Sequence, residues 1–160
     1  MSLNTIQEIE RAIGALTPRE IEELYAWLEQ HCPPPIDTRV QSDLAAGRLD
    51  KAIQRALDDE KNGRTQPLSH PMQHRATSDF WRQYDDLPQE VRARADKQFS
   101  LLKANSQHPS LQFKKVGERH GREIWSARVT LNHRALAIKR ADGYLWFWIG
   151  DHKAYEALIS

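Results

Sequence analysis

The sequence predicts an α+β protein in which an all-helical N-terminal segment precedes a part with two helices packed on an antiparallel sheet. Apolar residues recur at helical spacing early in the chain, whereas four stretches rich in apolar and β-branched residues lie near its end. Charge divides in the same way. Residues 1–68 contain 8 Lys and Arg against 12 Asp and Glu, a net of −4, and residues 72–160 contain 15 against 10, a net of +5. This asymmetry predicts two modules, of which the basic one suits a polyanion.

Residues 1–32 predict a helical hairpin. Threonine at Thr17 can cap a helix, Pro18 suits the first turn, and Glu20 completes a capping box. Two short amphipathic helices each leave an apolar face to bury, so we expect them to pack on each other or to form a homodimer through residues 3–30. The apolar positions are Leu3, Ile6, Ile9, Ile13 and Leu16 in the first helix and Ile21, Leu24, Tyr25 and Leu28 in the second.

Residues 36–62 predict two further helices, Asp37 to Ala46 and Asp50 to about Lys61, after three prolines end the hairpin. Such thin helices are marginal when isolated. We expect them to wrap a partner surface, although a solvated helical linker is the alternative. Their large apolar residues, and so the expected contacts, are Val40, Leu44, Leu49, Ile53 and Leu57.

A polar stretch with Gly63, Pro67 and Pro71 separates the two parts, and we place the linker itself at 69–71. The second part begins near Met72, with a short strand from Gln73 to Ala76. A helix capped by Thr77 or Ser78 and a longer helix from Gln89 to about Lys103 follow. Four strands then alternate with turns, and a last helix covers His152 to Ile159. The expected strands are Leu111–Val116, Glu123–Leu131, Arg134–Arg140 and Leu145–Gly150.

Several motifs of the second part, in order and with natural spacings, carry a family resemblance. They are Met72-Gln73-His74-Arg75, Asp79-Phe80-Trp81, His108-Pro109-Ser110-Leu111-Gln112-Phe113-Lys114-Lys115-Val116, Trp125-Ser126-Ala127-Arg128-Val129, His133-Arg134-Ala135-Leu136-Ala137 and Trp146-Phe147-Trp148-Ile149-Gly150-Asp151-His152 with Tyr155. In these motifs residues 72–160 resemble a bacterial type II toxin of the RelE/ParE superfamily. The first part, 1–68, is similar to the small helical antitoxins that are encoded just upstream of such toxins, as in Asp43-Leu44-Ala45-Ala46-Gly47-Arg48-Leu49-Asp50.

The resemblance implies a toxin and its antitoxin on one chain, with a basic concave sheet. That sheet either cleaves messenger RNA, on the ribosome and without a metal, or inhibits DNA gyrase, as in the ParE branch. The Gly-x-His pattern at the end of the last strand resembles the histidine-using, YafQ-like toxins. This implies His152 as the general acid or base, with Tyr155 stacking on or positioning a base of the RNA.

Basic residues in or near the expected strands complete the candidate site. Arginine is the better clamp for a transition state because its planar fork meets two phosphate oxygens, so Arg128 and Arg134 join the catalytic candidates. Neighbouring residues in a strand face opposite ways, so at most one of Lys114 and Lys115 faces the groove. His120 and His133, both in expected turns, are alternatives for the second proton transfer. The candidates for RNA binding are Lys114, Lys115, Arg119 and Arg122.

The remaining sequence features restrict the function classes. No Cys, His, Asp and Glu cluster has the spacing of a metal site and no glycine-rich loop precedes a helix, so we expect no metal and no cofactor. Cys32 is the only cysteine, and neither a signal sequence nor an apolar span is recognisable, which favours the cytoplasm. A complex that represses its own operator DNA is a further alternative. The acidic first part, with its lack of a basic recognition helix, disfavours it.

Overall fold

The computed structural model describes residues 5–31, 35–67 and 74–160, and the chain divides into two compact units, Met1–Pro34 and Pro35–Ser160. The expectations for Leu3, Cys32, the linker at 69–71 and the start of a strand at Gln73 lie outside the described residues. No helix within the described ranges is long and apolar enough to cross a membrane.

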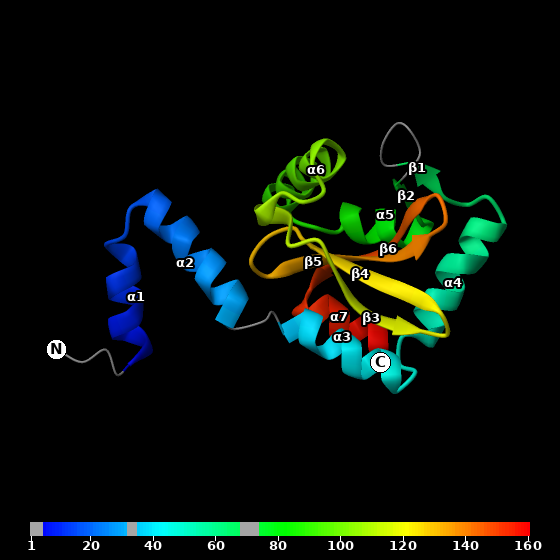
Figure 1. Ribbon diagram of the computed structural model, residues 1–160, viewed down its shortest axis with the longest axis horizontal. Coiled ribbons are helices and arrows are strands. Elements are labelled where there is room, and N and C mark those ends of the chain that lie inside the picture. Colours follow the sequence, from blue (N-terminus) through cyan, green and yellow to red (C-terminus); the bar gives the residue numbers. More distant parts are fainter. Residues whose placement is uncertain (1–4, 32–34, 68–73) are drawn as a thin grey trace. The chain divides into compact units, whose positions relative to one another are not determined.

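The first unit contains α1 (Ile6–Gly14) and α2 (Pro18–His31). The expected capping box is present: Thr17 N–H donates to Glu20 Oε1 at 2.9 Å, and Glu20 N–H donates to Thr17 Oγ1 at 3.2 Å. Figure 1 shows the two helices as the blue part of the ribbon. Neither helix has a fully buried side chain among its described residues, and Ile6 is 74% exposed. The apolar stripes predicted from the sequence are therefore only partly buried in this unit.

The second unit is built on one six-stranded sheet with the strand order β1-β2-β6-β5-β4-β3. Strands β3 to β6 form an antiparallel meander joined by short turns. The strands are β1 (Gln66–Pro67), β2 (His74–Ala76), β3 (Lys114–Arg119), β4 (Arg122–Arg128), β5 (His133–Arg140) and β6 (Gly143–Asp151).

Helices cover both faces of the sheet (Figure 1). On one face, α5 (Ser78–Asp85) and α6 (Gln89–Ala104) enclose a core that includes Phe80, Leu102 and Trp146. On the other face, α3 (Pro35–Ala45), α4 (Asp50–Lys61) and α7 (His152–Ile159) enclose a second core. The predicted α+β class, with helices first and a sheet afterwards, is confirmed.

The sheet differs from the expected antiparallel one at its β2 end. His74, Arg75 and Ala76 pair in parallel with Tyr144, Leu145 and Trp146 of β6, and β1 adds an antiparallel edge beyond β2. Sequence patterns give a strand's length but not the neighbour it pairs with, so the mixed sheet could not be predicted in this way.

Two smaller differences concern the strands themselves. Pro109–Leu111 forms a 3-10 turn, and β3 begins only at Lys114. Between β5 and β6, Leu136 pairs with Trp148 and Ala137 pairs with Trp146, so Phe147 is an extra residue of β6. Because of this bulge both Phe147 and Trp148 join the core beneath α4 and α7, where simple alternation would separate them.

Candidate functional site

The candidate site lies on the sheet face that α3 covers, at one end of β3, β4 and β5. Lys114 of β3 pairs with Ser126 of β4, and Arg128 pairs with Arg134 of β5. Alternation along each strand places these four side chains on the same face. The sequence-predicted residues Lys114, Arg128 and Arg134 are thus brought together, whereas Lys115 is exposed on the other side.

Asp37 of α3 reaches three of these groups. Its Oδ1 accepts a hydrogen bond from Ser126 Oγ at 2.7 Å, and its Oδ2 lies 3.5 Å from Lys114 Nζ and 3.9 Å from Arg134 Nε. Arg134 is only 1% exposed and Ser126 is fully buried. A guanidinium that is so fully removed from water needs an opposite charge nearby, and the Asp37 carboxylate supplies one.

Asp43, two turns further along α3, contacts the C-terminal helix. Tyr155 of α7 donates from its hydroxyl to Asp43 Oδ2 at 2.7 Å. Arg48 Nη1 lies 3.0 Å from Asp43 Oδ1, and Arg39 lies over the Tyr155 ring and pairs with Glu156. Burial, followed by the hydrogen bond to Asp43 and its charge, raises the pKa of the Tyr155 phenol. Tyr155 is therefore a neutral donor, packed edge-on against Trp148 with ring centroids 5.6 Å apart.

The end of β4 is attached to the opposite layer by Gln98 of α6. The buried Gln98 amide donates from Nε2 to the backbone carbonyl oxygens of Ser110, at 3.0 Å, and of Arg128, at 2.8 Å. These two hydrogen bonds hold the backbone of Arg128 in place from the face that its side chain does not occupy. Gln98 is a positioning residue that inspection of the sequence did not identify.

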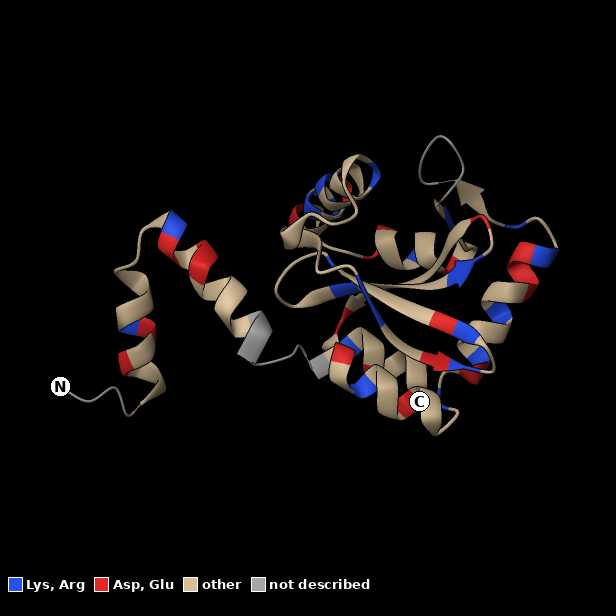
Figure 2. Cartoon of the chain, in the orientation of Figure 1, with Lys and Arg blue, Asp and Glu red and all other residues tan. Residues whose placement is uncertain are grey.

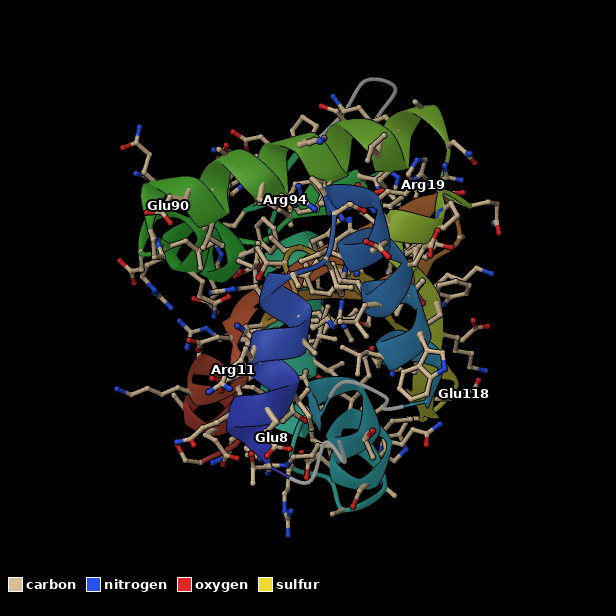
Figure 3. The ribbon with its side chains drawn as sticks, turned by 90° about the vertical axis from the view of Figure 1, so that its left-hand side faces the viewer. Glu8, Arg11, Arg19, Glu90, Arg94 and Glu118 are labelled. Carbon is tan, nitrogen blue, oxygen red and sulfur yellow. The ribbon has the colours of Figure 1, made fainter. Side chains whose placement is uncertain are left out.

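The two remaining arginine candidates lie at the far end of the β3–β4 hairpin. Arg119 lies 3.3 Å from Asp50 and also donates to the Ala45 carbonyl at 3.3 Å, so it holds the turn between α3 and α4. Arg122 is exposed at the hairpin tip, where acidic and basic residues adjoin on both strands (Figure 2). The structure therefore separates Arg119 and Arg122 from the group around Arg134.

His152 begins α7, directly after β6. Its side chain is 54% exposed, and Nε2 lies 3.4 Å from Glu156 Oε1. Asp151 caps the helix, accepting from Ala154 N–H at 2.9 Å. His133 belongs to β5 and faces away from Arg134, since the two are neighbours in a strand. Burial lowers the pKa of His133, which outweighs the opposing effect of Asp151. His120 lies in the turn between β3 and β4 and is exposed.

The five apolar residues expected to contact a partner surface all face the sheet. Val40, Leu44, Leu49 and Ile53 are buried, and Leu57 is partly buried against the same core as Ile124, Leu136 and Tyr155. The fit is close at Gly117 of β3, where an added Cβ would lie 2.6 Å from Leu44 Cδ1. The segment from α3 to α4 thus supplies a large part of the core on this face.

A separate hollow lies between α4, α5 and α7, away from the residues around Arg134. It has a volume of about 400 Å³ and includes Lys51, Arg55, Asp79 and Arg82 among its lining residues. Asp79 lies 2.6 Å from both Arg55 and Arg82, so much of the charge in this hollow is already paired. Within the described part of the chain no group of three or more His, Cys, Asp and Glu residues is placed to hold a metal ion.

Sequence reasoning missed Ser126, Asp37 and Asp43. A signal for Asp37 was present, because it falls three residues before Val40 and seven before Leu44 and so shares their helix face. A carboxylate in line with the apolar stripe of a helix indicates a polar partner on the surface that the stripe covers. Ser126 has no such signal in the sequence.

Comparison with known proteins gives one match. Residues 89–157 match the family model described as the ParE-like toxin domain. The matched range begins at α6 and includes all four strands of the meander and most of α7, so it contains Lys114, Arg128, Arg134, His152 and Tyr155. The match supports a toxin of the RelE/ParE superfamily as the C-terminal part. No curated protein and no solved structure matches the chain.

Proposed function

We propose that residues 72–160 form a toxin that cleaves messenger RNA without a metal, and that α3 and α4 of the same chain hold it inactive as an antitoxin. The toxin assignment is supported by the match to the ParE-like toxin domain. The observation that carries the antitoxin assignment is the cover over Arg134 and Tyr155: both side chains are buried, and each contacts an aspartate of α3.

Cleavage of RNA at its own 2′-hydroxyl needs a base, an acid and cations for the charge that develops on the phosphate. His152 is the proton-transfer group in this proposal, because its imidazole is exposed and can both accept and donate a proton. Arg134, with Arg128 and Lys114 beside it, stabilises the charge on the phosphate. Tyr155 positions a base once Asp43 releases its hydroxyl.

Inhibition follows from the same contacts. While α3 lies on the sheet, an RNA strand cannot reach Arg134, although His152 stays exposed to solvent. Covalent connection keeps the inhibitor at a high effective concentration, on the order of millimolar for a short connection, so the intact chain is expected to be inactive.

One observation favours a second candidate function. The matched family is described by the ParE name, and the ParE branch of the resemblance implies inhibition of DNA gyrase with no chemistry. In that case the basic group around Arg134 would bind a protein, and His152 would have no role in toxicity.

Expression of three forms in bacteria separates these candidates. The full chain is expected to be tolerated. Residues 72–160 alone are expected to arrest growth and to cut messenger RNA, as mapped by primer extension. The same is expected of a full-length Asp37→Arg, Asp43→Arg variant, in which position 37 is repelled by Arg134 and position 43 loses the hydrogen bond from Tyr155. His152→Ala in the same backgrounds is expected to relieve the arrest.

The gyrase candidate predicts different results from the same strains. Toxicity would persist with His152→Ala, would induce the DNA-damage response and would be relieved by extra gyrase. Equal toxicity with and without His152, together with intact messenger RNA, would exclude the nuclease. A tolerated Asp37→Arg, Asp43→Arg variant that is folded and keeps α3 on the sheet would exclude inhibition through these aspartates.

A further inference from the structure

Three polar groups from three adjacent strands converge on the Asp37 carboxylate. Ser126 Oγ donates to it at 2.7 Å, and Lys114 Nζ and Arg134 Nε lie 3.5 and 3.9 Å away. All three groups belong to the sheet, whereas Asp37 belongs to the helix that covers it. The sheet therefore carries a cradle of donors that α3 fills with a single carboxylate.

Asp37 fills this cradle incompletely. A charge-assisted N–H···O hydrogen bond spans about 2.7–2.9 Å, and the separations from Asp37 to both nitrogen atoms exceed this. A larger tetrahedral anion, which presents oxygen atoms in more directions, would reach Ser126 on one side and both cations on the other.

The alternative explanation is a buried ion pair that only stabilises the fold. Buried ion pairs are commonly no more stable than well-packed apolar residues of the same size, so stability alone gives no reason for this cluster. The register of the strands indicates a binding role for the cluster. It aligns Lys114 of β3 with Ser126 of β4 and sets Arg134 on β5 at the same end of the sheet.

We propose that Asp37 occupies a phosphate-binding site, in which Ser126 Oγ, Lys114 Nζ and the Arg134 guanidinium hold one phosphate group of single-stranded RNA. Ser126 is thereby a binding residue of the toxin, and α3 inhibits by imitating the substrate as well as by covering the sheet. That the phosphate belongs to RNA rests on the proposed function, whereas the preference of the site for phosphate does not.

The test uses the full chain with Asp37→Ala, which empties the cradle but leaves α3 attached through its apolar residues. The probe is inorganic phosphate, titrated at constant ionic strength against sodium acetate and sodium chloride, and the measurement is the Tm. We expect phosphate to raise the Tm of Asp37→Ala with increasing concentration, more than acetate does and much more than chloride.

Asp43→Ala is the control for the loss of a buried carboxylate from the same helix, since Asp43 contacts Arg48 and the Tyr155 hydroxyl of α7 and does not lie over the donors of the sheet. Because Arg48 is largely exposed, the Tm of Asp43→Ala is expected to respond to phosphate clearly less than that of Asp37→Ala. Adding Ser126→Ala to Asp37→Ala is expected to weaken phosphate binding about tenfold, as the loss of one hydrogen bond to a charged group does. Asp37→Ser replaces Asp37→Ala if that variant does not fold.

Three results would overturn the proposal: an equal response of Asp37→Ala to phosphate and chloride, a response to acetate as large as that to phosphate, or an unchanged phosphate affinity with Ser126→Ala. RNA cleavage is scored separately. Phosphate binding without cleavage by any toxic form would retain the site and reject the nuclease. Cleavage by a toxic form, without a phosphate response of Asp37→Ala, would retain the nuclease and reject the phosphate site.

Discussion

The two faces of the sheet are covered in different ways. Beneath α5 and α6 the core is mainly aromatic and apolar, with the Phe99 ring in contact with both Phe80 and Trp146. Beneath α3, α4 and α7 the core is equally buried but includes Asp37 and Asp43 with their polar partners. The first cover comes from the same part of the chain as most of the sheet, whereas α3 and α4 of the second cover precede that part and only α7 belongs to it.

This difference indicates what each cover is for. An apolar cover must match the surface beneath it only in shape and volume. Exposing that surface to water would greatly lower the free energy of unfolding. The cover on the α3 face combines apolar residues with buried carboxylates, so it must match the donors of the sheet in position and charge as well as in shape. The α3 face is therefore the more demanding of the two in the cover that it accepts.

The largest effect that separates the faces is expected from Phe80→Ala. This side chain is fully buried between Trp81 and Phe99, so its truncation is expected to lower the free energy of unfolding by about 3–5 kcal/mol. Urea unfolding measures the change. Leu131→Ala, at an exposed position, is the control and is expected to change it by less than about 0.5 kcal/mol.

Asp37→Ala comes next and probes the ionic face. It leaves the Arg134 charge buried without this carboxylate, which is expected to lower the free energy of unfolding by about 3 kcal/mol. This is the lower end of the range for a broken buried pair, because the other cation beside Asp37, Lys114, is half-exposed. Asp37→Leu with Arg134→Met, which removes both charges, is expected to cost clearly less. If the double variant is the less stable of the two in urea, the ionic contacts are a source of net stability and the contrast between the faces is lost.

A pair of tyrosines compares the same chemistry in both layers. Tyr155 donates to Asp43 at 2.7 Å and is fully buried, whereas Tyr84 of α5 donates to the exposed Asp96 at 2.5 Å. Tyr155→Phe is expected to cost about 1.5–3 kcal/mol, because it removes a buried hydrogen bond to a charged group. Tyr84→Phe is expected to cost less than about 1 kcal/mol. Thermal unfolding of both variants measures the difference, and equal losses would contradict it.

The smallest effect concerns pH and the α5–α6 face. Burial, with the nearby Lys103 charge, lowers the pKa of His74, whose Nδ1 accepts from the Trp146 indole at 3.2 Å. As the pH falls, the unfolded chain therefore binds a proton at His74 before the folded chain does. The free energy of unfolding is highest above the ordinary histidine pKa of about 6.5, and it decreases as the pH falls from there towards the lowered pKa of the folded state. His74→Gln is expected to make the free energy of unfolding less dependent on pH in this window. His133→Gln is the control and is expected to keep the pH dependence that His74 causes. Identical pH profiles for wild type and His74→Gln would refute the assignment.

Much of the fold was accessible from the sequence because its signals are local. The periodicity of Val91, Ala95, Phe99 and Leu102 predicts α6, and Asp142-Gly143 predicts the β5–β6 turn; both are present. The parallel pairing of β2 with β6 and the extra residue at Phe147 were not accessible, because they depend on which strands meet in space.

The candidate site was accessible only in part, for the same reason. The family resemblance and the charge pattern single out Arg134, and the structure places it beside Lys114 and Arg128. Nothing local distinguishes Ser126 from any other serine in a strand, or Gln98 from any other polar residue of a helix. Their positions follow from the register between β3 and β4 and from the packing of α6.

The close approach of Leu44 to Gly117 has a consequence for the packing of α3 on the edge strand. A side chain at position 117 would meet the end of the Leu44 side chain, which would have to move to another rotamer, while the residues around Arg134 stayed untouched. Under the proposed function, a substitution at this one position would loosen the cover over the sheet without changing the charged residues beneath it.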